Sequence, residues 1–205
     1  MSHTLIKEGK YSYIEAGEGR PIILLHGLMG TVSNFEGVLD HFSKIGYKVI
    51  LPELPLYTLP ILKTNVKNLS KFLKDFMAFK KIENAILLGN SLGGHIGLYF
   101  TKLNLKNVDA LVLAGSSGLY EKSMGDTYPK RGNYDYIKTK TQEVFYNPEV
   151  ATKEIVDEVY ASVNDRSRVI KTLAIAKSAI RLKFSIVLKE LFQLQGIYFN
   201  SKEIN

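Results

Sequence analysis

Hydrophobic and polar residues follow a repeating order through the first half of the chain, in which short apolar runs precede longer stretches with apolar residues at helical spacing. The run at 21–25 is continuously apolar, as expected of a β-strand that is covered on both faces. Further short strands are predicted at 47–51, 85–88 and 108–114, the last of them also as a buried strand. Residues 4–16 alternate enough to predict one or two leading strands.

Helices are predicted between these strands. Ser33 followed by Glu36 forms a capping box, which predicts a helix that stops at Gly46. A second helix, which runs to about Lys80, carries lysines on one face and apolar residues on the other. A third occupies 91–103. The alternation of strand and helix predicts an α/β fold, with a doubly wound, mostly parallel sheet and helices on both of its faces.

The character of the sequence changes at about Glu121. Three helical segments follow, near 133–144, 148–163 and 165–191, with many Tyr, Lys and Glu residues and no buried strand. This pattern predicts a helical insertion over the C-terminal edge of the sheet. The expected organisation is an α/β core (1–120), a helical cap (121–190) and a C-terminal tail (191–205).

Composition limits the classes of protein that fit. A length of 205 residues suits one domain, or one domain with an insertion, and a hydrophobic content of 45% is enough for a packed core. No apolar run is long enough to span a bilayer, and residues 1–8 lack the basic-then-apolar pattern of a signal peptide. The absence of cysteine excludes disulfides and cysteine catalysis and fits a reducing compartment, so we expect a cytoplasmic protein.

The net charge of +7 raises the question of nucleic-acid binding. The lysines are scattered, and the clearest group of them lies at helical spacing opposite apolar residues, as the solvated face of one helix: Lys63, Lys67, Lys71 and Lys74. An excess of basic residues is weak support for nucleic-acid binding when the sequence has no aromatic residues interleaved with them and no known nucleic-acid-binding motif. We therefore expect neither a nucleic-acid partner nor a membrane partner.

The candidate chemistry centres on the sequence Gly-Asn-Ser-Leu-Gly at 89–93, which joins an apolar strand directly to a helix. This is the strand–turn–helix context of a nucleophile elbow. A turn that lifts the Ser91 hydroxyl clear of the sheet strains the backbone and brings it close to neighbouring chain, so Gly89 and Gly93 keep those approaches free of Cβ atoms. The alternative is an elbow that survives only as architecture.

A second motif, His-Gly-Leu-Met-Gly at 26–30, follows the strand at 21–25. With both motifs in this order, and with the Gly-Ser-Ser-Gly turn at 115–118 and the helices after it, the chain resembles the α/β-hydrolase superfamily in its version with a helical cap. The resemblance covers residues 4 to about 182. It is specific for the fold and much less so for the substrate.

The resemblance implies a role for each motif residue. Ser91 would be the nucleophile, and the backbone N–H groups of Leu28 and Leu92 would form the oxyanion hole. His26 would shape the oxyanion turn by hydrogen bonding rather than act as the catalytic base. The remaining supporting positions are Gly27, Gly89, Asn90 and Gly93.

The sequence departs from the family pattern after the nucleophile. In that pattern the serine is followed by an acid and then by a histidine, but no histidine follows His95. His95 itself lies one helical turn after Ser91, whereas a triad histidine faces the serine from a separate loop. No carboxylate stands where the family places the acid. Three aspartates of the helical part are expected to be solvated: Asp126, Asp135 and Asp157.

Two consequences are expected from this departure. The chain would be the N-terminal part of a longer hydrolase, shortened by a premature stop, by a frameshift after about residue 182 or by the limits of the expressed piece, and two C-terminal strands would be missing. The last strand would then be an exposed apolar edge, which favours self-association.

The function implied by the resemblance is hydrolysis of an ester-like or carbon–carbon bond of a small molecule through a serine acyl-enzyme, impaired here because the triad acid and base are lacking. The alternative is a non-catalytic pseudo-hydrolase or binding module that keeps the pocket. We predict no cofactor and no metal site. Residues 89–94 are not a phosphate-binding loop, because the lysine and Ser/Thr of a P-loop are missing.

Overall fold

The computed structural model describes residues 3–28, 35–117 and 130–182 of the chain. Its strands are β1 (Ile6–Glu8), β2 (Tyr11–Ala16), β3 (Arg20–Leu25), β4 (Tyr47–Pro52), β5 (Ala85–Asn90) and β6 (Val108–Ala114). Its α-helices are α1 (Glu36–Lys44), α2 (Val66–Phe79), α3 (Leu92–Leu103), α4 (Tyr134–Gln142), α5 (Lys153–Asn164) and α6 (Arg166–Arg181). Short 3-10 helices are η2 (Ile61–Lys63), η3 (Leu105–Asn107) and η5 (Pro148–Val150).

The strands form a single six-stranded sheet in the order β1-β2-β4-β3-β5-β6. The four strands β4, β3, β5 and β6 run parallel to one another, and the antiparallel hairpin of β1 and β2 extends the sheet because β2 pairs antiparallel with β4. The carboxyl ends of β3 and β5, which carry the two sequence motifs, lie side by side at the centre because Leu25 pairs with Gly89. The predicted α/β fold with a mostly parallel sheet is confirmed.

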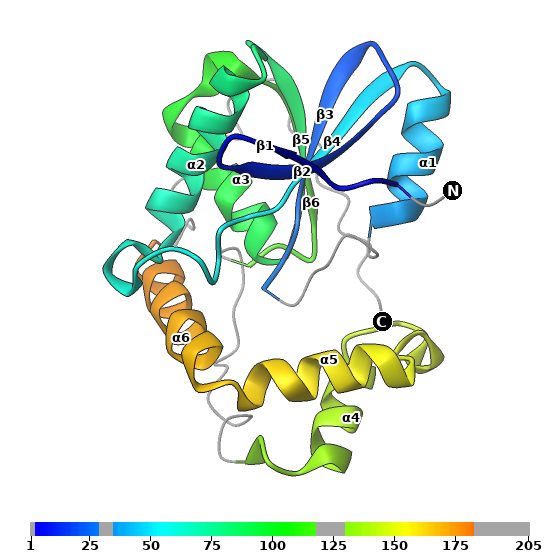
Figure 1. Ribbon diagram of the computed structural model, residues 1–205, viewed down its shortest axis with the longest axis vertical. Coiled ribbons are helices and arrows are strands. Elements are labelled where there is room, and N and C mark those ends of the chain that lie inside the picture. Colours follow the sequence, from blue (N-terminus) through cyan, green and yellow to red (C-terminus); the bar gives the residue numbers. More distant parts are fainter. Residues whose placement is uncertain (1–2, 29–34, 118–129, 183–205) are drawn as a thin grey trace.

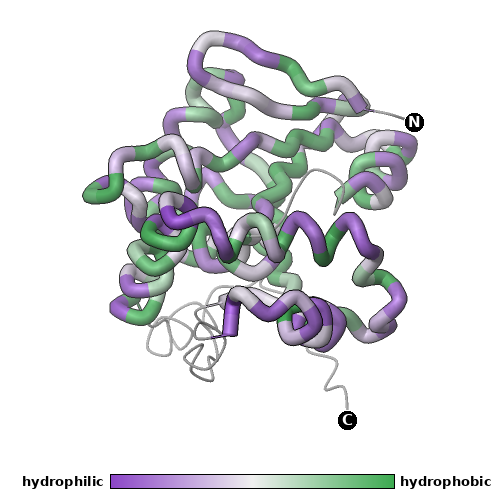
Figure 2. Tube along the Cα trace, turned by 60° about the horizontal axis from the view of Figure 1, so that its bottom comes forward, coloured by the Kyte–Doolittle hydropathy of each residue, from purple (hydrophilic) through white to green (hydrophobic). Residues whose placement is uncertain are grey.

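Helices cover both faces of the sheet (Figure 1), and in Figure 2 hydrophilic and hydrophobic stretches alternate along them, as amphipathic packing requires. On one face, Leu39 of α1 packs in a cluster with Ile22 and Leu24 of β3. On the other face, α2 and α3 pack over Ile23 and Leu25 of the same strand. Alternate residues of β3 therefore serve two separate cores, which is why its sequence is apolar throughout.

Two local predictions need correction. The helix α1 begins at Glu36 with Phe35 at its N-cap, which makes no side-chain capping bond, and Ser33 lies outside the described residues. The strand β6 is not buried as predicted: only Leu111 is fully buried along it, and Val112 is 41% exposed. The reason is its place in the sheet, since β6 is the last strand in the order and, among the strands that the structure describes, pairs with β5 alone.

The helices α4, α5 and α6 follow β6 and form a separate arm below the sheet (Figure 1). Residues 130–182 contain no strand, as predicted. Of these helices, α6 packs on the core: Ile175 and Ala179 join the cluster of α2 and α3, and the Ser178 hydroxyl accepts a hydrogen bond of 3.0 Å from the Val66 amide at the start of α2. The proposed boundaries at residues 120 and 190 fall outside the described residues.

None of the helices within the described ranges has the length and apolar character needed to cross a bilayer.

The helix α3 lies so close to the sheet that side chains are excluded at the contact. A Cβ atom on Gly93 would stand 1.9 Å from the carbonyl oxygen of Leu25, and one on Gly97 would stand 2.9 Å from the Leu111 side chain. The first neighbour is backbone of a central strand and cannot move aside. The close approach of α3 to β3 therefore depends on glycine at position 93.

We predict that Gly93→Ala lowers the free energy of unfolding by about 3 kcal/mol, because the new methyl group displaces either α3 or the end of β3. The matched control is Gly37→Ala in α1, where an added Cβ meets nothing within 4 Å. Removing the conformational freedom of that helical glycine should stabilise the protein by about 0.5 kcal/mol. Urea denaturation of both variants measures the two changes. Equal effects at the two positions would contradict the close-approach interpretation.

Candidate active site

Ser91 occupies the junction between β5 and α3 in a backbone conformation that L-residues rarely adopt. Its φ is 51° and its ψ is −117°. Hydrogen bonds fix this conformation: the Ser91 amide donates to the Ala114 carbonyl over 3.1 Å, and the Ser91 carbonyl accepts from the Ser117 amide over 3.1 Å. Backbone strain of this kind persists only where the surroundings enforce it, and it concentrates at functional sites.

The glycines on either side make the turn possible. A Cβ on Gly89 would stand 2.5 Å from the backbone of Gly93, and one on Gly94 would stand 2.4 Å from the Ser116 hydroxyl. Asn90 donates from its side-chain amide to the Ala114 carbonyl over 3.2 Å and so joins the elbow to β6. The motif at 89–94 thus has a steric reason for its glycines, as the sequence predicts.

The turn after β3 lies directly against Ser91. A Cβ placed on Gly27 would be 3.2 Å from the Ser91 Cβ. The side chain of His26 donates from Nδ1 to the Gly27 carbonyl over 2.8 Å. Because C=O and N–H of one trans peptide point in opposite directions, this bond also fixes the direction of the Leu28 N–H. As the first residue of α3, Leu92 has no intrahelical acceptor for its own amide.

His26 is held as a neutral ring. Its Nδ1 donates to Gly27, and its Nε2 accepts a hydrogen bond of 3.0 Å from the Leu54 amide. Burial lowers the pKa of His26 below its ordinary value, and the bond to Gly27 and the charge of Glu53 raise it only in part. With both ring nitrogens bonded to backbone, His26 has no free lone pair to take a proton from Ser91.

The other candidate acids and bases make contacts elsewhere, are exposed, or lie outside the described residues. His95 is fully buried on α3, with its Nδ1 3.5 Å from the Ser117 hydroxyl. Asp135 is exposed. Asp157 pairs within the helical arm with Lys153 and Tyr134, whose hydrogen bonds lower its pKa, and Asp126 lies outside the described residues.

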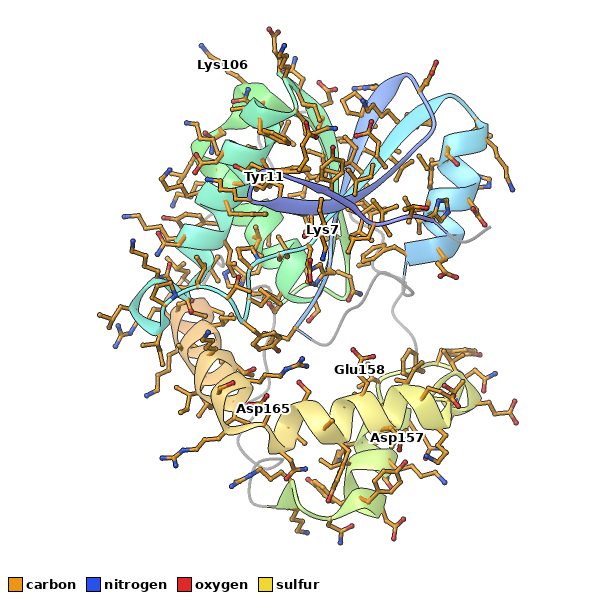
Figure 3. The ribbon with its side chains drawn as sticks, in the orientation of Figure 1. Lys7, Tyr11, Lys106, Asp157, Glu158 and Asp165 are labelled. Carbon is orange, nitrogen blue, oxygen red and sulfur yellow. The ribbon has the colours of Figure 1, made fainter. Side chains whose placement is uncertain are left out.

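A cavity of about 270 Å³ lies between the carboxyl ends of β3 and β4 and the helices α5 and α6. Leu28 and His26 of the turn after β3 line it, but Ser91 does not. Five leucines contribute to its wall, and Glu53, Glu158 of α5 and Arg168 of α6 are its charged lining residues. Figure 3 shows Glu158 rising from α5 toward the sheet. The cavity is suited to a small, largely apolar ligand next to the turn.

Two cavity residues have no counterpart in the sequence-based site. Tyr57 and Arg168 both line the cavity and contact each other, although 111 positions separate them in the sequence. The proline-rich loop that contains Tyr57 carries no motif, and Arg168 is one of many basic residues on amphipathic helices, so nothing in the sequence singles them out. No cluster of three or more His, Asp or Glu residues that could hold a metal occurs within residues 3–28, 35–117 and 130–182.

The neutral state of His26 predicts a pH dependence of stability. Its pKa is lowered in the folded state, so the unfolded chain binds the proton first as the pH falls. The contribution of the neutral His26 ring to the free energy of unfolding is therefore complete above about pH 6.5. It is lost as the pH falls below that value, and the free energy of unfolding then decreases by up to about 1.4 kcal/mol per pH unit. Urea denaturation between pH 8 and pH 5.5 measures it, above the range where carboxylates titrate.

The variant His26→Gln should lose most of this slope, whereas His41→Gln, at an exposed position of α1, should keep it. An unchanged slope in the His26 variant would show that another group is responsible.

Comparison with known proteins agrees with this geometry. Residues 20–188 match the family model described as alpha/beta hydrolase fold. Among solved structures, MGS-MChE2, an alpha/beta hydrolase enzyme from a sediment metagenome of the Mar Chica lagoon in Morocco, is 49% identical. It superposes with a TM-score of 0.71, and the match covers 90% of this chain and 69% of that one.

Curated relatives are more distant. A 2-hydroxy-6-oxo-6-(2'-aminophenyl)hexa-2,4-dienoic acid hydrolase of Metapseudomonas resinovorans is 32% identical over 133 residues, which is 62% of this chain and 45% of the relative. A 2-hydroxy-6-oxononadienedioate/2-hydroxy-6-oxononatrienedioate hydrolase of Comamonas testosteroni is 26% identical over 186 residues, 82% of this chain and 65% of the relative. The chain therefore spans about half to two thirds of the length of these relatives.

The family model matches most of the chain, and the sheet order, the strained serine between strand and helix and the glycine contacts around it agree with that match. This chain therefore belongs to the alpha/beta hydrolase family.

Proposed function

We propose that this chain carries the nucleophile and oxyanion half of a serine hydrolase that cleaves an ester-like or carbon–carbon bond of a small, largely apolar molecule. The observation that carries the proposal is the left-handed backbone of Ser91, held against a turn whose peptide plane His26 orients. The names of the curated relatives, hydrolases of 2-hydroxy-6-oxo dienoic acids, support the carbon–carbon alternative. We further propose that α4–α6 act as the cap over the cavity.

In the proposed reaction, the Ser91 hydroxyl oxygen adds to the substrate carbonyl carbon and its proton leaves to a base. The carbonyl oxygen becomes an oxyanion, which the Leu28 and Leu92 amides stabilise, each donor contributing about 3 kcal/mol in comparable sites. When the substrate is an ester, collapse of the tetrahedral intermediate expels an alcohol, which takes up the proton. When the substrate is a ketone, the bond to the neighbouring carbon breaks and that carbon takes up the proton. Water then hydrolyses the acyl-serine and releases the acid.

We propose that these 205 residues perform this reaction slowly. His26 has both nitrogens engaged, and His95 is buried beside Ser117, so we assign neither of these two histidines as the base. A serine without a base is a weak nucleophile near neutral pH. The oxyanion hole and binding alone accelerate such reactions by about 10³-fold over water.

The same observation supports a second candidate, a non-catalytic binding module that keeps the fold and the cavity. This candidate predicts ligand binding in the cavity without covalent chemistry at Ser91. The two candidates therefore differ in whether the Ser91 oxygen reacts.

A fluorophosphonate probe tests the serine directly. We expect mass spectrometry to find the adduct on Ser91, to find none in Ser91→Ala, and to find wild-type labelling in Ser162→Ala. Ser162 is the matched control because it is a buried serine that lines the cavity on α5. Folded wild-type protein that stays unlabelled would contradict the hydrolase proposal and favour the binding module.

A further inference from the structure

Tyr57 makes a specific contact with the oxyanion turn. It lies in the loop between β4 and η2, and its hydroxyl donates to the Leu28 carbonyl over 3.1 Å. The preceding carbonyl, that of Gly27, is the acceptor of His26. Two successive carbonyls of the turn are thus bound by two side chains, so the peptide planes on both sides of the Leu28 Cα are fixed.

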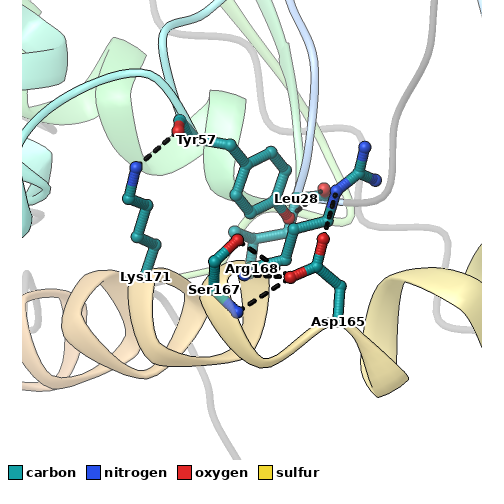
Figure 4. Close-up of polar contacts among 6 residues, drawn as sticks. All are labelled: Leu28, Tyr57, Asp165, Ser167, Arg168 and Lys171. Carbon is teal, nitrogen blue, oxygen red and sulfur yellow. Dashed lines mark hydrogen bonds and ion pairs between the residues drawn. The ribbon is translucent and has the colours of Figure 1, made fainter.

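The same tyrosine is held from the other side by α6 (Figure 4). The Arg168 guanidinium lies over the Tyr57 ring with its Cζ 5.2 Å from the ring centre, within the range of a cation–π contact. The Lys171 ammonium, one turn further along α6, donates to the Tyr57 carbonyl. Ring, main chain and hydroxyl of Tyr57 are therefore each fixed by a different partner.

Arg168 is itself placed by the start of its helix. Asp165 caps α6 by accepting hydrogen bonds from the Ser167 amide at 2.8 Å and the Arg168 amide at 3.2 Å. Its other carboxylate oxygen lies 3.8 Å from the Arg168 Nε. The guanidinium is thus held between a carboxylate and an aromatic ring, and both of its neighbours restrict the directions it can take.

From these contacts we propose that Tyr57 is a positioning residue that couples the helix α6 to the Leu28 amide. The coupling runs from Arg168 through the Tyr57 ring and hydroxyl to the Leu28 carbonyl, and from that carbonyl across the Leu28 Cα to the Leu28 amide, which His26 holds only from the Gly27 side. The role of the Leu28 amide as an oxyanion donor rests on the proposed function, but the mechanical coupling does not.

The coupling has a consequence for ligands. Leu28, Tyr57 and Arg168 all line the same cavity. A molecule that enters it contacts the oxyanion turn and the α6 partner of Tyr57 together. A ligand that keeps Arg168 over the ring preserves the Leu28 geometry, and one that displaces Arg168 loosens it. Occupation of the cavity and alignment of the oxyanion donor become linked.

The test uses Tyr57→Phe, which keeps the ring and removes only the hydroxyl. Its matched control is Tyr160→Phe, which removes another tyrosine hydroxyl bonded to a backbone carbonyl, that of Gly132 in the helical arm. The primary readout is the NMR order parameter of the Leu28 amide. We expect about 0.85 in the wild type and the control, and below about 0.7 in Tyr57→Phe. An unchanged value, or an equal decrease in both variants, overturns the proposal.

The α6 side is tested by Arg168→Gln against Arg166→Gln, a change two positions away on the same helix. We expect Arg168→Gln to loosen the Leu28 amide as Tyr57→Phe does, and Arg166→Gln to leave it rigid. The double variant, with Tyr57→Phe and Arg168→Gln, should have the same Leu28 order parameter as each single variant, because both changes break the same chain of contacts. Fully additive effects mean that the helix and the tyrosine act independently, which overturns the coupling.

The rate of fluorophosphonate labelling at Ser91 separates this proposal from the proposed function. If both hold, labelling of Tyr57→Phe slows by about fivefold, the scale of one lost hydrogen bond, while Tyr160→Phe labels at the wild-type rate. If Ser91 is not labelled in any variant, the hydrolase proposal fails, and the Leu28 order parameter still decides the coupling.

Discussion

The positive φ of Ser91 is the constraint on which the rest of the site depends. A serine does not adopt this conformation without cost, so the surrounding structure must enforce it. The enforcement comes from three directions: β5 fixes the residue before it, α3 begins at the residue after it, and backbone bonds tie it to the end of β6. Each of these requires close backbone contact, which explains the glycines at 89 and 93.

The neighbouring turn is built on a different principle, the use of a buried side chain as a structural connector. His26 bonds through one nitrogen to Gly27 and through the other to Leu54, and both bonds require the neutral ring. The low dielectric of its surroundings keeps the ring neutral and strengthens both bonds. A histidine next to a candidate nucleophile is thus committed to geometry rather than to proton transfer.

Long-range contacts then link this turn to the part of the chain that follows the sheet. The α6 helix reaches the core at its C-terminal half through Ile175 and Ala179 and reaches the turn at its N-terminal half through Tyr57. The cavity lies between these attachments and the strand ends. The helical arm and the candidate site are therefore parts of one contact network.

Much of this arrangement can be predicted from sequence because it depends on local chemistry. Apolar runs locate the strands, and glycine spacing around Ser91 identifies the elbow, since both follow from period and from backbone sterics. The burial of β6 was predicted wrongly because an apolar run does not reveal whether a strand is central or at the edge. Tyr57 and Arg168 could not be found, because their roles arise only when a loop and a distant helix meet.

The most direct test of the central claim is the free energy of unfolding of Ser91→Gly compared with Ser91→Ala. Both variants lack the hydroxyl, but only glycine adopts the left-handed conformation without strain. The account predicts that the glycine variant is more stable than the alanine variant by about 1 kcal/mol. This figure is the backbone strain that glycine relieves minus the extra conformational entropy that glycine loses on folding. A glycine variant less stable than the alanine variant, as at an ordinary helix position, would contradict it.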